Sequence, residues 1–288
     1  MLQFTDLHPL FAAEVKGLDP AGDIDDRLFG RVSEAFARRS VLVFRDQNID
    51  DDRQIAFSER FGPLEATKVD TPGAGSKVVI LTNVDDTGNL LQPTSRQILN
   101  GRANQFWHTD SSFKEMAAAA SMLSARQIPP DGGNTEFISM RAVYAALPKR
   151  LKDAVAGRVA IHDYTYGRTK VDPHLVTDGE RATLPPVRQA MVLDHGAHGK
   201  SLYIGAHVAA IEGMAEADSR ELIDELTDFA TQEQFIYSHG WRPHDLVLWD
   251  NRATLHRGTA YDRTAHRRTM VRTTIAGTVS TLVGHGSR

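Results

Sequence analysis

The chain has 288 residues, a formal net charge of −4 at pH 7 and no cysteine; 41% of its residues are hydrophobic and 24% are charged. These values are ordinary for a soluble globular protein with a sizeable core, and they argue against broad nucleic-acid binding, which normally needs a basic surface. The lack of cysteine excludes disulfides, thiolate metal sites and a cysteine nucleophile, so any metal must be held by nitrogen and oxygen ligands.

The sequence also indicates a location and a domain organisation. No apolar run approaches the roughly 20 residues that span a membrane, and residues 1–6 lack the charged and apolar regions of a signal peptide. We therefore expect a cytoplasmic protein without membrane or nucleic-acid partners. There is no internal repeat and no low-complexity linker, so we expect a single domain over residues 1–288. The sequence is compatible with a homo-oligomer and does not indicate the oligomeric state.

The first third predicts two helices and a strand that serve as scaffold. Residues 25–39 place apolar side chains on one helical face, and residues 50–61 begin with an aspartate and end at Gly-Pro, so both segments are predicted to be helices. The apolar run 41–44 is suited to a buried strand. Residues 66–104 are rich in turn residues around one strand at 78–81, so a mobile lid and a plain surface loop are both open.

The middle of the chain mixes strands and short helices. We predict a strand-like run within residues 113–127, a tight turn at 129–133, a strand at 134–138 and helices at 141–146 and 148–156. Residues 163–188 are polar and broken by glycine and proline, which indicates an insertion. We interpret the two histidines in and beside it, His162 and His174, as surface residues.

The last third predicts strands at 189–193, 201–204, 235–237 and 246–249 and an amphipathic helix at 218–231. The turn between the first two strands contains His195 and His198. A glycine-rich hairpin with incidental histidines explains it better than a metal site, because no third ligand is evident. Many short strands separated by turns predict an antiparallel sandwich or barrel, so the fold class is mainly β with flanking helices.

The segment Trp107-His108-Thr109-Asp110, together with the distant His256, carries the candidate chemistry. Two imidazoles and one carboxylate on a common face form the facial triad of non-haem iron(II) oxygenases. On a strand, residues two apart point to the same side, so His108 and Asp110 can hold one metal while Thr109 points away. A His-x-Asp pattern alone is a weak signal, because such spacings often belong to solvated surface residues.

A basic strand follows His256. Arg268 and Arg272 share one strand face, and Arg267 points to the other. Two guanidinium groups on a buried face need anions to hold, which an acidic cosubstrate and an acidic substrate would supply. An exposed basic edge that discourages aggregation is the alternative, and these residues alone leave both open. If Arg267 pointed inward instead, the roles of Arg268 and Arg272 would both be in doubt.

Over nearly its whole length, the sequence resembles the iron(II)/2-oxoglutarate-dependent dioxygenases of the taurine dioxygenase group, and within that group the dioxygenases of 2,4-dichlorophenoxyacetate. The segments that carry the resemblance are residues 7–13, 40–45, 103–113, 132–137, 204–207 and 247–252. It implies a double-stranded β-helix, or jelly-roll, core. It also implies Fe(II) held by His108, Asp110 and His256, and 2-oxoglutarate whose far carboxylate is held by Arg268 and Thr135.

The resemblance further implies that O2 and 2-oxoglutarate give succinate and CO2 while a small anionic substrate is hydroxylated, with ascorbate as a stimulant. An aryloxyalkanoate of the phenoxyacetate type, cleaved at its ether bond as in herbicide degradation, is the expected substrate. A taurine or alkylsulfonate substrate is the alternative, and a non-catalytic metal-binding jelly roll or a metal-dependent hydrolase are rival classes. Trp249 is expected to pack beneath the site. Residues expected near the substrate are Arg272 on its anionic group, Asn104, Ser112, His207, Lys68, Val78 and Ile80.

Overall fold

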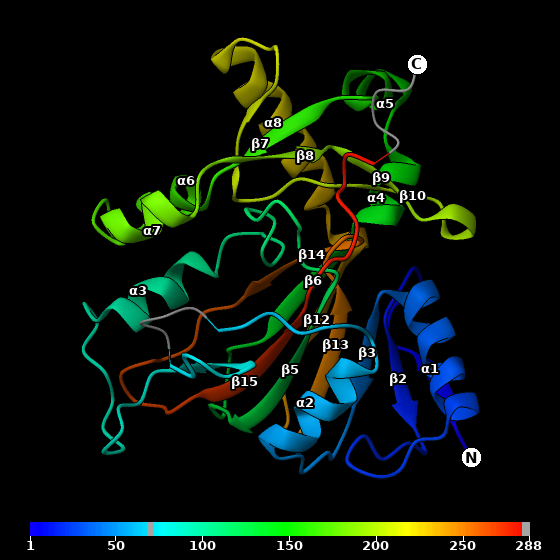
Figure 1. Cartoon of the computed structure of the whole chain (residues 1–288), viewed down its shortest axis with the longest axis vertical. Coiled ribbons are helices and arrows are strands. Elements are labelled where there is room, and N and C mark those ends of the chain that lie inside the picture. Colours follow the sequence, from blue (N-terminus) through cyan, green and yellow to red (C-terminus); the bar gives the residue numbers. More distant parts are fainter. Residues whose placement is uncertain (68–71, 284–288) are drawn as a thin grey trace.

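A computed structural model describes residues 1–67 and 72–283, and Figure 1 shows the arrangement of its elements. The largest sheet has seven strands, and all neighbouring strands are antiparallel except β2 and β3. Its strands in spatial order are β1 (Gln3–Asp6), β2 (Ala13–Lys16), β3 (Val41–Phe44), β13 (Leu246–Asp250), β5 (Ala120–Gln127), β15 (Thr269–Ile275) and β4 (Val78–Thr82).

A second sheet packs on one face of the first and forms the other half of a sandwich. It has the order β12 (Ile236–His239), β6 (Thr135–Ser139) and β14 (Thr254–Gly258). Phe137 of β6 and Tyr237 of β12 belong to the same buried cluster as Leu123, Val247 and Trp249 of the large sheet. This cluster fills the space between the sheets, and the candidate metal ligand His256 lies on β14 at its margin.

Helices α1 (Asp26–Arg39) and α2 (Asp51–Glu59) cover the opposite face of the large sheet (Figure 1). Leu42 and Phe44 of β3 pack against Val32 and Phe57 of these helices, whereas Val41 and Val43 point into the sandwich. The strand is therefore buried on both faces. This explains why it is a continuous apolar run rather than an alternating one.

The remaining elements surround the open end of the sandwich, at the top and left of Figure 1. They include two further sheets, one of β11 (Val208–Ile211), β7 (Val159–His162) and β8 (Val187–Ala190), the other of β9 (Val192–Asp194) and β10 (Lys200–Leu202). The other helices are α3 (Arg96–Ala103), α4 (Met140–Ala146), α5 (Lys149–Val155), α6 (Tyr164–Thr169), α7 (Asp178–Thr183) and α8 (Glu216–Ala230), with 3-10 turns at Gly196–His198 and Glu233–Phe235.

The predicted long helices and most of the apolar strands are confirmed within one or two residues of their expected ends. The strand expected at 189–193 is instead divided between β8 and β9, which belong to different sheets. The side chain of Asp25 caps α1 by accepting a hydrogen bond from Leu28 N at 2.7 Å, and Asp50 caps α2 in the same way. The prediction missed helix α3 within residues 66–104 and described residues 163–188 only as an insertion, although they contain α6 and α7. In α7, a capping box of Thr177 and Glu180 was a readable signal.

No helix within residues 1–67 and 72–283 combines the length and apolar character needed to cross a membrane.

The expectation that His162 is a surface residue is wrong. The residue ends β7 with no exposed surface, and its ring stacks on Tyr203 with the two centroids 5.5 Å apart. Neither ring nitrogen has a hydrogen-bond partner in the described part of the chain. His162 therefore behaves as a neutral aromatic residue of the core, whereas His174 is exposed as predicted.

This burial predicts an acid-sensitive fold. Burial lowers the pKa of His162 to about 3, whereas an unfolded histidine titrates near 6.5. Between these values the unfolded chain binds a proton that the folded protein does not, so stability falls as the pH falls. From pH 7 to pH 5, we expect this residue to remove about 2 kcal/mol from the free energy of unfolding. Urea denaturation at both pH values should show a smaller loss in His162→Leu than in wild type or His174→Leu. Equal losses in all three proteins would contradict the prediction.

Candidate metal centre and active-site cavity

The segment that contains His108 lies against strand β14. His108 N donates to His256 O at 3.0 Å, and His256 N donates to His108 O at 2.8 Å, which forms an isolated antiparallel bridge. The segment was expected to be a strand, but its pairing is limited to this bridge and Asp110 already begins a turn. The side chain of Thr109 still points away from those of His108 and Asp110, and its hydroxyl donates to Asn251 O at 2.5 Å.

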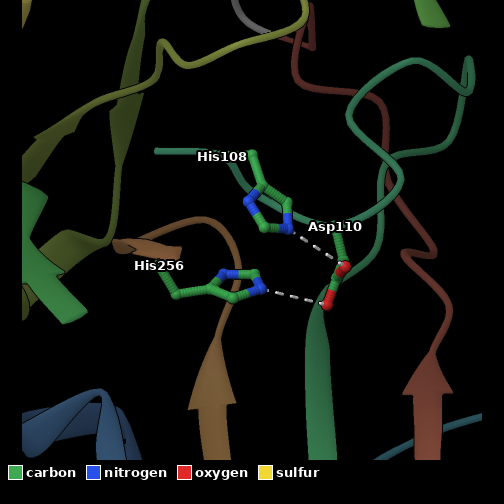
Figure 2. A group of neighbouring side chains, drawn as sticks. All are labelled: His108, Asp110 and His256. Carbon is green, nitrogen blue, oxygen red and sulfur yellow. Dashed lines mark ion pairs between the residues drawn. The ribbon is translucent and has the colours of Figure 1, made fainter. Parts of the chain in front are cut away.

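Figure 2 shows how His108, Asp110 and His256 converge. Nε2 of His108 lies 4.0 Å from one oxygen of Asp110, and Nε2 of His256 lies 3.7 Å from the other. One nitrogen or oxygen from each side chain lies within 4.8 Å of those of the other two, and all three residues are buried. Among the described residues, this is the one group of three or more His, Asp and Glu side chains that could hold a metal.

The protonation states at the cluster fit a bound cation. Nδ1 of His108 lies 2.8 Å from Phe106 O, so this nitrogen carries the proton and Nε2 presents its lone pair to the cluster. Burial lowers the pKa of both His108 and His256, which keeps the imidazoles neutral. Two neutral imidazoles that face one carboxylate from 3.7 and 4.0 Å offer lone pairs and a negative charge to a metal.

Asp110 is held in its ionised form. Burial by itself raises the pKa of this carboxyl, but the positive charge of Arg272, together with a hydrogen bond from Ser121, outweighs it and lowers the pKa. Arg272 Nη1 lies 2.5 Å from Asp110 Oδ1, and Ser121 Oγ donates to Asp110 Oδ2 at 2.7 Å. Asn251 in turn donates to Ser121 Oγ at 2.9 Å, so the carboxylate is fixed on both oxygens.

The cluster opens into a cavity of about 410 Å³ that Arg268 and Thr135 also line. Burial lowers the pKa of Arg268 to about 10, which still leaves it protonated near neutral pH. Thr135 Oγ1 accepts a hydrogen bond from Trp241 Nε1 at 3.0 Å, so its own proton is available to a ligand. Gly133 (φ +64°) lies against Arg268: a Cβ there would stand 3.4 Å from Arg268 Nε.

Residues 3–274 match the family described as "Taurine catabolism dioxygenase TauD, TfdA family". The chain belongs to this family. The alpha-ketoglutarate-dependent 2,4-dichlorophenoxyacetate dioxygenase of Cupriavidus pinatubonensis is 40% identical, over 93% of this chain and 96% of that protein. The (S)-phenoxypropionate/alpha-ketoglutarate-dioxygenase of Sphingobium herbicidovorans is 36% identical, over 90% and 91%.

The structural comparison agrees with the family. The crystal structure of AAD-2 in complex with Mn(II) and N-oxalylglycine has a TM-score of 0.90 to this chain, at 38% identity and with 98% of each chain covered. The predicted fold class, mainly β with flanking helices around a jelly-roll core, is confirmed. The protein is therefore a dioxygenase of the TauD/TfdA family.

The structure brings most of the predicted site residues of this dioxygenase to one cavity. Asn104, at the end of α3, and His207 both line it. Arg272 of β15 and Arg268, the residue before this strand, line it as well. Arg267 is exposed and lies outside this cavity, as the strand alternation required. Trp249 packs beneath the cluster as predicted, with its ring 4.8 Å from that of His256.

The expectation for Ser112 is not supported. This residue is buried outside the cavity lining, and its carbonyl accepts a hydrogen bond from Gln189 Nε2 at 3.0 Å, whereas Ser111 lines the cavity. The reason is local: Ser111 has a φ of 52°, so the alternation that starts at Asp110 is broken by a turn.

Residues 66–104, for which a mobile lid and a surface loop were both open, contribute to the cavity wall through β4 and α3. Ile80 lines the cavity as expected and Val78 does not, while Lys68 lies outside the described residues. Whether the segment moves stays a prediction. The sequence reasoning did not single out Arg168 and Tyr164 of α6, because a short helix inside a polar insertion gives no signal of its inward face; both line the cavity.

Proposed function

We propose that this dioxygenase hydroxylates a small anionic aryloxyalkanoate of the phenoxyacetate type, which cleaves the ether bond. The observation that carries the proposal is that one cavity unites the His108–Asp110–His256 cluster with Arg268 and Thr135. The cluster suits a divalent metal, and the cationic end suits the carboxylate of a dicarboxylic cosubstrate. The names of the two relatives, which act on 2,4-dichlorophenoxyacetate and (S)-phenoxypropionate, support the substrate class.

Iron(II), 2-oxoglutarate and O2 are the cofactor and cosubstrates of this type of enzyme, and the donor set fits them. His108, Asp110 and His256 would hold the iron and leave its remaining positions for ligands. When bound, the iron supplies the redox chemistry that converts 2-oxoglutarate to succinate and CO2 and adds an oxygen atom to the substrate. Ascorbate is expected to stimulate turnover by keeping the iron reduced.

The residues of the chain bind and orient the two organic substrates. Arg268 is directed at the cavity with its Nε buried and unpaired among the described residues, so the far carboxylate of 2-oxoglutarate would restore its charge balance. Thr135, held by Trp241, would donate a hydrogen bond to the same carboxylate. Asp110 stays ionised through Arg272, which keeps the charge that the metal needs.

The cavity also suits an aryl ring beside the cluster. The rings of Phe113, Tyr164 and His207 meet there, with centroid distances of 4.8 Å and 4.9 Å from Phe113 to the other two. Hydroxylation of a carbon that carries an ether oxygen gives a hemiacetal, which breaks down to a phenol and a carbonyl compound. A taurine or alkylsulfonate substrate is the alternative, because the family description includes taurine catabolism.

A substrate panel tests the proposal. Oxygen consumption and succinate should be measured with iron(II), ascorbate and 2-oxoglutarate, with 2,4-dichlorophenoxyacetate, both enantiomers of 2-(2,4-dichlorophenoxy)propionate and taurine. We expect an aryloxy acid to stimulate succinate formation and to release 2,4-dichlorophenol in equal amount. Turnover of taurine and of none of the aryloxy acids would contradict the aryloxyalkanoate class and favour the alkylsulfonate alternative. Metal binding without succinate from any acid would favour a non-catalytic protein and contradict the proposal.

A further inference from the structure

Asn251 connects the two segments that carry the metal ligands, although it lies outside the cavity lining. It directly follows β13, in the turn that leads into β14 and His256. The residue has no exposed surface, and its backbone N donates a hydrogen bond to Ala119 O at 3.0 Å, next to the start of β5. The turn before His256 is therefore fixed to the neighbouring strand at this asparagine.

The backbone around Asp110 depends on the same residue. In the described part of the chain, strand pairing of this segment is limited to the bridge between His108 and His256. Beyond that bridge, Asn251 Oδ1 accepts a hydrogen bond from Asp110 N at 3.3 Å, and Asn251 O accepts one from the Thr109 hydroxyl at 2.5 Å. One side chain and one carbonyl thus replace the sheet partner that the Asp110 segment lacks.

The side chain of Asn251 also acts on the Asp110 carboxylate, through Ser121 of β5. Trp249 Nε1, which can only donate, lies 2.9 Å from Asn251 Oδ1 and so fixes the orientation of the amide. Asn251 Nδ2 must then donate to Ser121 Oγ, which lies 2.9 Å away. The ionised carboxylate can only accept, so the Ser121 hydroxyl gives its proton to Asp110 Oδ2 at 2.7 Å. Trp249, Asn251 and Ser121 form a relay in which every hydrogen bond has one direction.

This relay complements the ion pair on the other carboxylate oxygen. Arg272 Nη1 lies 2.5 Å from Asp110 Oδ1, so a rotation of the carboxylate away from its present plane would weaken the contacts of both oxygens. Arg272 is long and partly exposed, whereas Ser121 and Asn251 are short and have no exposed surface. A partner whose own position is locked by packing holds a ligand more precisely than a flexible one.

We propose that Asn251 is a positioning residue of the metal centre: through Ser121, it holds the Asp110 carboxylate in the rotation that faces the two histidines. The inference rests on the metal site of the proposed function. Hydrogen-bonding partners of metal ligands contribute about 10- to 100-fold to metal affinity. Because the effect of Asn251 on the carboxylate passes through one hydroxyl, removal of the hydroxyl or of the amide should have the same consequence.

An anaerobic titration of the metal-free protein with iron(II) tests this without turnover. Isothermal titration calorimetry should give the Kd of iron(II) for wild type, Ser121→Ala, Asn251→Ala and the double variant. We expect each single substitution to raise the Kd about 10- to 100-fold. The double variant should bind no more weakly than Asn251→Ala alone, because the hydroxyl has no fixed direction once the amide is gone.

Ser124 on the same strand provides the matched control. It is buried three residues after Ser121 and therefore on the opposite face of β5. Its hydroxyl has no hydrogen-bond partner among residues 1–67 and 72–283, and it does not line the cavity. Ser124→Ala removes the same atom from the same strand, so it should bind iron(II) like wild type.

The visible spectrum of the cobalt(II)-loaded protein separates positioning from a structural role, because cobalt d–d bands depend on the number and geometry of the ligands. Ser121→Ala and Asn251→Ala should both change these bands, and Ser124→Ala should not. A purely structural role would lower the melting temperature of the metal-free protein and leave the iron(II) Kd and the cobalt spectrum as in wild type. That result would overturn the inference.

Two further results also decide the question. If the fold-changes of the single variants multiply in the double variant, Ser121 and Asn251 act independently and the relay is wrong. If Asn251→Ala does not fold, Ser121→Ala carries the test alone: a raised Kd with a changed spectrum supports the relay, and wild-type values overturn it. Wild type that binds no iron(II) would defeat the proposed function as well, whereas iron(II) binding without succinate would defeat the proposed function alone.

Discussion

The variant Asp110→Asn is expected to lose substrate-dependent oxygen consumption and succinate formation altogether. Asparagine keeps the shape of the side chain but removes the negative charge that faces Nε2 of both histidines. Even the loss of a group that only supports a metal ligand lowers metal affinity roughly 10- to 100-fold. Loss of one of three proposed ligands should therefore lower iron(II) affinity by more than about 100-fold.

The measurement should separate metal loss from misfolding. The substitution also leaves Arg272 without its buried ionic partner, and breaking such a pair costs about 3–5 kcal/mol. Circular dichroism should therefore confirm the fold at low temperature before iron is titrated by calorimetry. Asp86→Asn is a suitable control, because Asp86 is exposed and lies outside the cavity lining. A folded Asp110→Asn protein that bound iron as wild type does would exclude this carboxylate as a ligand.

The parts of the fold that the sequence predicted are those where local signals agree. Helix α1 has an aspartate cap, a one-sided apolar face and basic residues in its last turn, and strand β3 is apolar on both faces because both are buried. Helices α3 and α6 have eight and six residues. Helices this short depend on tertiary contacts more than on propensity, so their own sequences do not identify them.

In the site, too, the features that local sequence patterns determine were predicted, and those that depend on tertiary structure were not. Parity along β15 and the residue before it placed Arg268 and Arg272 on one side; the register shift against β5 has its extra residue, Arg126, in β5, so the alternation of β15 itself is kept. Parity failed from Asp110 to Ser112, because Ser111 adopts a left-handed conformation that no composition pattern signals. The meeting of His108 with His256 depends on pairing across more than a hundred residues, and it was inferred from family resemblance, not from spacing.

The variant Arg268→Met is expected to raise the 2-oxoglutarate concentration for half-maximal activity about 10- to 100-fold, since a charge-assisted pair to the far carboxylate is lost. In the protein without ligands, Arg268 has an unpaired buried Nε and burial lowers its pKa to about 10. Its removal should therefore leave the melting temperature unchanged or higher. The rise in melting temperature caused by 2-oxoglutarate should shrink instead.

In wild type, 2-oxoglutarate affinity should fall as the pH rises towards 10, because Arg268 then loses the proton that the anion needs.

The neighbouring arginine provides the matched control. Arg267→Met removes the same charge one residue away, but this side chain is exposed and points out of the cavity. Its 2-oxoglutarate dependence should match wild type in both kinetics and thermal shift. If Arg267→Met were defective and Arg268→Met normal, the strand would present its other face to the site. Arg272 would then point outward as well, so one pair of variants tests the register on which both arginine assignments depend.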